Sequence, residues 1–188
     1  MTELDVEALG EPLFGEGIMG DPFEERHRNA LRAACAEDLG IWQIYSMNFG
    51  PEDFDRNIDL LSTSSRNRTF VLFEGEALVG MSSFLGIDEP RQVVEIGATY
   101  YRPAFRGSGF NARSKDMMLK RAFSCGVRRV EFRVDVRNAR SQAAVTKIGG
   151  VKEGLLRADR ITWTGHVRDT VLFSILADEW DRSASVQR

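Results

Sequence analysis

The chain has few cysteines, no long apolar run and no overall excess of positive charge. Its longest near-apolar stretch, Val171–Ala177, is far shorter than the roughly 20 residues of a membrane-spanning helix. The acidic start, MTELDVEALGEPLF, lacks the basic and then apolar regions of a signal peptide. Cys35 and Cys125 lie far apart and form neither a CxxC pair nor a metal cluster. We therefore expect a cytoplasmic protein with no membrane segment, disulfide framework or metal site.

The length and charge indicate the class of protein. With 188 residues and 43% hydrophobic content, we expect one domain over residues 1–188, with flexible ends at 1–15 and 181–188. The net charge of -3 argues against a general nucleic-acid binder, although the charge is unevenly distributed. Residues 102–147 carry twelve Lys or Arg and three acids, whereas residues 1–60 carry fourteen acids and four arginines. The acidic part would attract a cationic amine, or is simply a solvated surface.

Hydrophobic periodicity predicts alternating helices and strands. Helical spacing predicts four helices: one over residues 23–39, a second that begins at Pro51, a third over 110–126 and a fourth over 138–149. Strand patterns cover 16–20, 69–74, 77–87, 93–101, 128–136, 155–164 and 167–176. In the fifth of these strands, Val130, Phe132, Val134 and Val136 alternate with charged residues, which predicts one buried face. The element order predicts a mixed α/β (α+β) sandwich rather than a regular βαβ repeat.

The stretch VVEIGATYYRPAFRGSGFN, residues 93–111, organises the rest of the chain. It predicts a strand, a Pro-containing turn and a Gly-rich loop that opens a helix. Backbone N–H groups at a helix N-terminus form an anion site, and glycines allow a phosphate to approach closely. We therefore expect a phosphate-bearing ligand at residues 106–111.

Two familiar phosphate motifs fit this loop poorly. GSGFNA matches G-x-G-x-x-G/A, with Glu131 about twenty residues later. However, residues 102–105 separate the loop from its strand, and Glu131 starts the next strand instead of ending it. Too little chain follows to complete a doubly wound sheet. A Walker A loop is excluded because the chain contains no Gly-Lys-Ser/Thr.

The pattern resembles the GNAT N-acetyltransferase superfamily, in particular its RimJ/RimL-type branch. The resemblance rests on Arg106-x-x-Gly109-x-Asn111 after a strand and a Pro-x-Phe turn, then Asn138-x-x-Ser141 and the Arg168-Asp169-Thr170 strand. It covers about residues 69–180. It implies a mostly antiparallel central sheet with helices on both faces, and acetyl-CoA as the donor substrate.

The resemblance also implies roles for individual residues. Backbone amides of the loop would bind the pyrophosphate, and the end of the preceding strand would pair with the pantetheine arm. Asn138 and Ser141 would form hydrogen bonds near the thioester. The implied cofactor-binding residues are Thr99, Tyr100, Tyr101, Arg106, Gly107, Ser108, Gly109, Phe110, Asn111, Ala112, Asn138 and Ser141. Arg106, Arg113 and Arg140 are candidates for the 3′-phosphate.

Acetyl transfer to an amine requires a general base, because most amines are protonated at neutral pH. Glu95 is the candidate, eleven residues before Arg106, and strand alternation would place it on one face with Gly97 and Thr99. Val145 stands where many superfamily members have a tyrosine that protonates the thiolate, so Ser141 is the nearest hydroxyl. Ser141 is equally well interpreted as a helix-start residue. His27 and His166 are expected at the surface.

The leading interpretation is an N-acetyltransferase acting on a protein α-amine or a small-molecule amine, as a monomer or homodimer. The second is a catalytically silent acyl-CoA-binding domain, and the third is a nucleic-acid-binding surface over residues 102–147. Few aromatics accompany the basic residues there, so base stacking is poorly supported. Trp42, Tyr45 and Phe49 form either a substrate-facing wall or, more simply, core packing.

Overall fold

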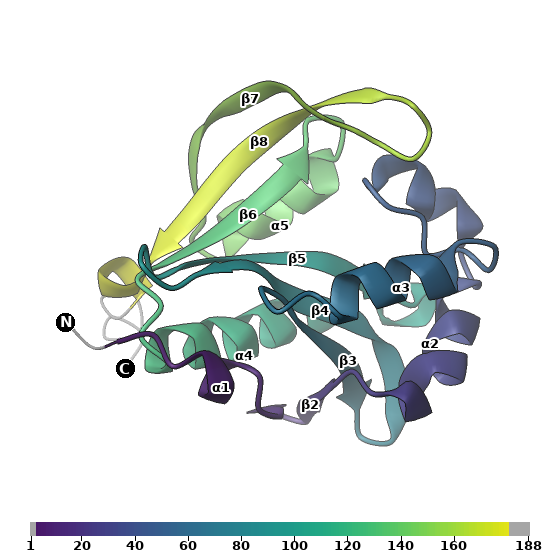
Figure 1. Cartoon of the computed structure of the whole chain (residues 1–188), viewed down its shortest axis with the longest axis horizontal. Helices are drawn as coiled ribbons and strands as arrows, with labels where there is room; N and C mark the ends of the chain where they lie inside the picture. Colours follow the sequence, from purple (N-terminus) through teal and green to yellow (C-terminus); the bar gives the residue numbers. More distant parts are fainter. Residues whose placement is uncertain (1–2, 181–188) are drawn as a thin grey trace.

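The computed structural model describes residues 3–180 and is organised around one eight-stranded sheet (Figure 1). Its strands are β1 Leu13–Gly15, β2 Ile18–Pro22, β3 Arg68–Glu74, β4 Ala77–Asp88, β5 Val93–Tyr101, β6 Arg129–Asp135, β7 Val151–Ile161 and β8 Val167–Leu176. Its α-helices are α1 Val6–Leu9, α2 Arg28–Cys35, α3 Phe54–Ser62, α4 Phe110–Ser124 and α5 Ala139–Lys147. Three 3₁₀ segments are η1 Glu25–His27, η2 Leu39–Ile44 and η3 Pro103–Phe105.

The strands follow the order β1-β2-β3-β4-β5-β6-β8-β7. Every neighbouring pair is antiparallel except β5 and β6, which are parallel. The expectation of a mixed, mostly antiparallel sheet is therefore confirmed. Because β5 and β6 are parallel, their carboxyl ends lie at the same edge, where the Gly-rich loop and the start of α5 follow.

Each face of the sheet has its own hydrophobic core. On one face, Phe110, Met118 and Leu119 of α4 pack with Val94 and Ile96 of β5. On the other, Leu31 of α2 and Ile58 of α3 pack near Trp42 and Phe49. Helices thus cover both faces, as predicted, and β5 carries apolar side chains into both cores. None of the described helices is long and apolar enough to cross a membrane.

Two predictions near the N-terminus are wrong. Residues 3–15 were expected to be a flexible end, but Leu9 and Leu13 are fully buried in α1 and β1. The predicted helix over 23–39 is shorter, because the Phe23 N–H donates to the Thr69 carbonyl and continues the sheet edge. The predicted flexible end at 181–188 lies outside the described residues.

Strand β6 also differs from its prediction, because both of its faces are covered. Val130 and Phe132 are buried as expected, but Glu131 and Asp135 on the opposite face are 8% and 3% exposed. Each of these carboxylates is paired with arginines, which is how charged groups are usually accommodated in an interior. The alternating pattern correctly predicted the strand, but the charged face is covered by polar side chains rather than by water.

Candidate active site

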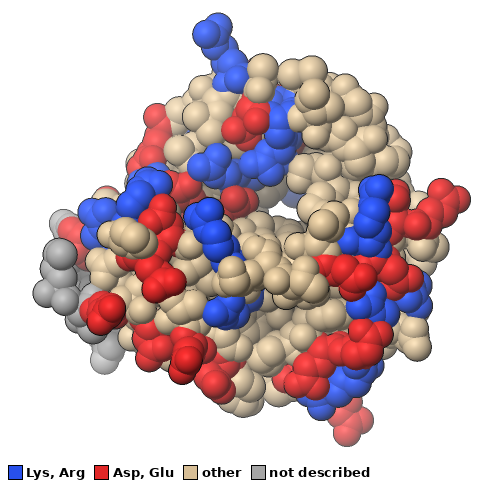
Figure 2. All heavy atoms as spheres, viewed as in Figure 1, with Lys and Arg blue, Asp and Glu red and all other residues tan. Residues whose placement is uncertain are grey.

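The sheet splits between β5 and β6. The two strands pair only from Val93 to Glu95 and from Arg129 to Glu131, over three residues each. Beyond these residues the strands diverge, and β6, β8 and β7 fan away from the rest of the sheet (Figure 1). The space-filling view shows an opening between the two parts (Figure 2). The divergence leaves the end of β5, residues 96–101, with an edge not bonded to β6.

A bulge at Ala98 marks the start of this open edge. Ala98 has a φ of 46°, and the register between β4 and β5 shifts between Met81 and Ser83. A bulge inserts an extra residue and reverses the alternation of side chains beyond it. Glu95 and Gly97 share a face as predicted, but the Thr99 side chain contacts Lys115 of α4 on the other face. The predicted grouping of Glu95 with Thr99 is therefore wrong.

Backbone groups of Thr99 and Tyr101 face the split. The Arg102 N–H donates to the Val79 carbonyl of β4, so alternation directs the amides of Thr99 and Tyr101 the other way. Their carbonyls already accept hydrogen bonds, from the Tyr45 hydroxyl at 2.6 Å and from Arg106 Nε at 2.8 Å. Two main-chain N–H groups thus remain on the open edge for an extended ligand.

The Gly-rich loop leaves most of its amides free. Gly107 and Gly109 have φ values of 80° and 83°, a conformation that favours glycine. Within residues 3–180, the N–H groups of Gly107, Ser108 and Gly109 donate no hydrogen bond. The Phe110 N–H makes a long contact of 3.4 Å with the Ser108 hydroxyl, while its ring packs against Tyr101 in the core. The loop therefore presents an N-terminal helix nest suited to an anion.

The three arginines proposed for a 3′-phosphate differ in their existing partners. Arg106 is held by Asp38 and the Tyr101 carbonyl, and Arg113 by Glu74 and the Glu16 carbonyl. Arg140 is exposed at the first turn of α5 and forms no ion pair among residues 3–180. Much of the basic segment is thus neutralised internally, and blue and red side chains alternate on the visible face (Figure 2).

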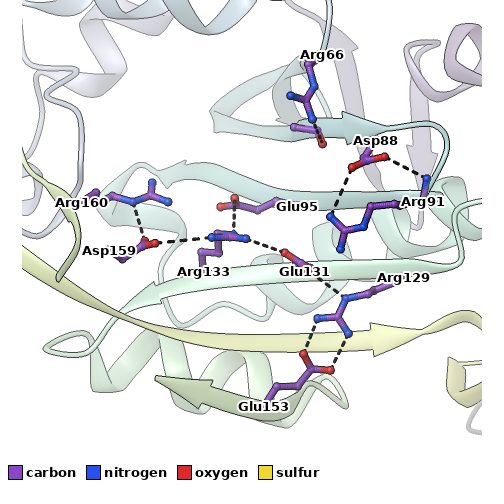
Figure 3. A network of polar contacts seen from close by, with 11 residues as sticks. Arg66, Asp88, Arg91, Glu95, Arg129, Glu131, Arg133, Glu153, Asp159 and Arg160 are labelled. Atoms are coloured by element: carbon purple, nitrogen blue, oxygen red, sulfur yellow. Dashed lines mark hydrogen bonds and ion pairs between the residues drawn. The ribbon is translucent and has the colours of Figure 1, made fainter. Parts of the chain in front are cut away.

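Glu95 lies in a charged network on the face of the sheet opposite α4 (Figure 3). Its Oε2 is 3.7 Å from Nε of Arg133 on β6, which also contacts Glu131 and Asp159. The network continues through Arg129 to Glu153 and through Asp159 to Arg160. Most of these carboxylates have close arginine partners, whereas Glu95 has one long ion pair. Its carboxylate is therefore the least engaged of those that face the split.

Burial controls the protonation of Glu95. Desolvation raises the pKa of this carboxyl, and the nearby guanidinium groups of Arg160 and Arg133 oppose the increase. Gly97 gives the carboxylate room, because a Cβ at Gly97 would lie 2.7 Å from Oε1 of Glu95. Glu95 thus leans along β5 toward the bulge. A partly buried carboxyl with a raised pKa beside an open edge has the properties of a general base.

The start of α5 lies at the carboxyl end of β6. Oδ1 of Asn138 accepts from the Ser141 N–H at 2.9 Å, so this asparagine is the helix N-cap. Ser141 is partly exposed, and Val145 is buried against the α4-side core. Position 145 therefore supplies packing and no proton donor. The thioester contacts predicted for Asn138 and Ser141 remain predictions.

The β7–β8 hairpin closes over the face that carries Glu95. The indole Nε1 of Trp163 donates to the Trp42 carbonyl at 2.8 Å, and the main-chain N–H of Trp163 donates to the Ser46 carbonyl. The hairpin is thereby tied to η2 and the segment after it. His166 is exposed in the hairpin turn, as predicted. His27 is 8% exposed and contacts Asp21, so the prediction of a surface histidine is wrong there.

Sequence reasoning missed two contributors to this region. Lys115 is buried beneath Thr99, and it sits three residues before Met118 on the apolar stripe of α4, which was a usable signal. Trp163 gave no signal, because its contacts with η2 join residues 121 positions apart. For Trp42 and Phe49 the core interpretation is confirmed, whereas Tyr45 is only partly buried and reaches the open edge of β5.

The fold and site define a class of protein: a split mixed sheet with a helix start suited to an anion, as in acetyltransferases. The model of the acetyltransferase (GNAT) domain family matches residues 21–151. The chain belongs to this family and is an acetyl-CoA-dependent acetyltransferase. No curated protein matches it.

Solved structures show the same fold. A probable GNAT-family acetyltransferase from Chromobacterium violaceum is 28% identical with a TM-score of 0.89, covering 96% of this chain and 93% of that one. Mycobacterium smegmatis RimJ, solved with CoA-disulfide, is 18% identical with a TM-score of 0.80, covering 100% and 98%. RimL, a ribosomal L7/L12 α-N-protein acetyltransferase solved with coenzyme A, is 18% identical with a TM-score of 0.78, covering 90% and 99%.

Proposed function

We propose that this protein transfers an acetyl group from acetyl-CoA to a primary amine, either a protein N-terminal α-amine or the amine of a small molecule. The observation that carries the proposal is the juxtaposition of two features. The edge of β5 is open from residue 96, and the free amides of Gly107, Ser108 and Gly109 begin six residues after β5 ends. One extended ligand with a diphosphate and an amide-bearing arm matches both features.

The donor would be bound mainly through the main chain. Loop amides and the positive end of α4 would hold the pyrophosphate. The N–H groups of Thr99 and Tyr101 would pair with the pantetheine arm as an added strand does. We assign the 3′-phosphate to Arg140, since the other two candidate arginines already have carboxylate partners.

Chemistry would take place at the bulge. Glu95 accepts a proton from the ammonium of the acceptor, directly or through water, and the freed lone pair attacks the thioester carbon. The carbonyl electrons move to oxygen, where a main-chain N–H near Ala98 or Thr99 donates to the oxyanion. Collapse breaks the carbon–sulfur bond and the nitrogen loses its second proton to solvent. The thiolate takes a proton from solvent, either directly or through Ser141, which regains its own proton from solvent.

We further propose a RimJ/RimL-type enzyme that works in the cytoplasm. Support for the branch comes from the loop, the Asn138-x-x-Ser141 pair and the similarity in fold to RimJ and RimL. Support for the compartment comes from two buried cysteines that remain unpaired.

The many ion pairs on α2 and α3, such as Arg28 with Asp59, favour a structural role for much of the acidic excess in residues 1–60.

A paired glycine experiment tests the donor site. Gly109 and Gly86 both have positive φ values, 83° and 59°, and a Cβ at either would meet nothing within 4 Å. Alanine at either position therefore costs a similar strain, about 1–2 kcal/mol. Gly109→Ala should also lower acetyl-CoA affinity by roughly 10-fold or more, because the Cβ obstructs the phosphate. Gly86→Ala, on β4, should leave the affinity unchanged.

Calorimetry with acetyl-CoA gives the result directly, and a thiol-release assay against amines and N-terminal peptides follows. Equal affinities in both glycine variants would contradict the loop assignment. Binding without turnover on any amine would favour the silent acyl-CoA-binding alternative.

A further inference from the structure

Lys115 of α4 is a buried lysine that the chemistry above does not use. Its side chain is 6% exposed, and Nζ donates to Oγ1 of Thr99 at 2.6 Å and to Oγ of Ser82 at 3.0 Å. The two hydroxyls are 2.7 Å apart and hydrogen-bonded to each other. Three polar atoms from α4, β4 and β5 therefore form a closed triangle inside the protein. Lysines are seldom buried in this way unless they are paired with an acid.

No carboxylate balances this amine within residues 3–180. Asp116, the next residue of α4, pairs with Lys120, and Glu74 pairs with Arg113 of the same helix. Glu95 lies on the other face of β5 and pairs with Arg133. Two phenols bond to the immediate neighbours of the triangle: Tyr101 to Ser114 of α4, and Tyr45 to the Thr99 carbonyl. Burial lowers the pKa of Lys115 to about 7, with no charge opposing the shift.

The triangle lies directly behind the bulge. Thr99 follows Ala98, whose φ of 46° ends the regular alternation of β5. The hydroxyl of Thr99 is held by Lys115 from the α4 side, while its amide lies on the open edge. Ser82 belongs to β4 where the β4–β5 register shifts. Lys115 thus joins both strands at the point where their own ladder is interrupted.

We propose that Lys115 is a positioning residue for acetyl transfer: it fixes the amide of Thr99 through the threonine hydroxyl, and its unbalanced positive charge favours the negative charge that develops on the thioester oxygen. The inference rests on the proposed function, because that function places the reacting carbonyl at this bulge. A positive charge in a water-poor interior acts strongly over short distances. Stabilisation that grows as the oxyanion forms raises kcat more than it tightens substrate binding.

The test compares Lys115→Met and Lys115→Arg with Lys120→Met, an exposed lysine five residues later on the same helix. Lys115→Met should lower kcat on the order of 10–100-fold, with little change in acetyl-CoA affinity or in the KM of the amine. Lys115→Arg should restore part of kcat. In the wild type the rate should fall as the ammonium deprotonates, and Lys115→Arg should move this alkaline limb to higher pH. Lys120→Met should match the wild type.

The outcomes separate the two proposals. A wild-type protein that does not bind acetyl-CoA refutes the proposed function itself. Normal binding, with unchanged kcat and pH profile in Lys115→Met, refutes only the role of Lys115. Parallel losses of folding stability and acetyl-CoA affinity, without a selective loss of kcat, also refute it, because they indicate a structural lysine. If Lys115→Met does not fold, Thr99→Val decides: the proposal requires that it lowers kcat and shifts the alkaline limb, and unchanged values of both refute it.

Discussion

Neutralising Glu95 should leave the thermal stability unchanged or raise it, whereas neutralising Glu131 should lower it. Both glutamates contact Arg133. Glu131 accepts hydrogen bonds from Arg129 Nε at 3.0 Å and from Arg133 Nη2 at 3.2 Å. Among residues 3–180, the one ion pair of Glu95 is the 3.7 Å contact with Arg133. The substitutions Glu95→Gln and Glu131→Gln conserve shape, so their effects report on charge and proton affinity.

The direction in which stability changes with pH follows from the raised pKa of Glu95. The folded state retains a proton that the unfolded chain, with a pKa near 4.5, releases more readily. Stability therefore decreases as pH rises from about 4.5 toward the raised value, and the loss persists at neutral pH. Glu95→Gln removes this titration, so the Tm at pH 7 should stay the same or rise.

Glu131→Gln should be destabilising. It weakens charge-assisted hydrogen bonds to two arginines at a site 8% exposed, which costs about 1.5–3 kcal/mol. For a domain of this size, 1 kcal/mol corresponds to roughly 2–4 °C, so the Tm should fall by roughly 3–12 °C. The effect on catalysis is the second difference between the two variants. Glu95→Gln should lower kcat by about 10²–10⁴-fold and flatten the rise of rate with pH.

The assay combines thermal unfolding at pH 5 and pH 7 with pH–rate profiles for acetyl transfer. The Tm difference between the wild type and Glu95→Gln should be smaller at pH 5 than at pH 7. A Tm drop in Glu95→Gln as large as that in Glu131→Gln would show that Glu95 is a structural ion-pair partner. A preserved pH slope in Glu95→Gln would exclude it as the base.

Two further predictions concern the frame of the site. Gly80→Ala should destabilise the protein by about 1–3 kcal/mol and weaken acetyl-CoA binding, because the new Cβ overlaps the Tyr100 carbonyl and lies 3.0 Å from Cα of Tyr101. Thermal unfolding measures the stability and calorimetry measures the affinity. An unaffected affinity would mean that the edge of β5 does not contact acetyl-CoA. Trp163→Phe removes the 2.8 Å bond to the Trp42 carbonyl and should raise the KM of the amine without changing acetyl-CoA affinity. Steady-state kinetics test this, and a change confined to acetyl-CoA would place the hairpin on the donor side instead.

Local sequence signals predicted much of the fold and of the donor loop. Strand β5 and helix α4 begin at the expected residues, because alternation and a Gly-rich helix start are encoded by neighbours in the chain. The glycines at 107 and 109 have the positive φ values that a close anion site needs. The helix over 23–39 was overpredicted, since an edge bond from Phe23 to the sheet competes with helix formation there.

The sequence by itself determined the elements, their order and the chemical character of the loop, because these depend on residues close together in the chain. Only the tertiary structure decided where β5 and β6 part and which side of β5 Thr99 faces. It also decided that Lys115 bonds to Thr99 and pairs with no carboxylate of the described residues. A one-residue bulge reverses every side chain after it, and its position depends on pairing with a neighbouring strand. Burial of charge likewise depends on what packs from distant segments, so the pKa values of Glu95 and Lys115 could not be predicted from the sequence.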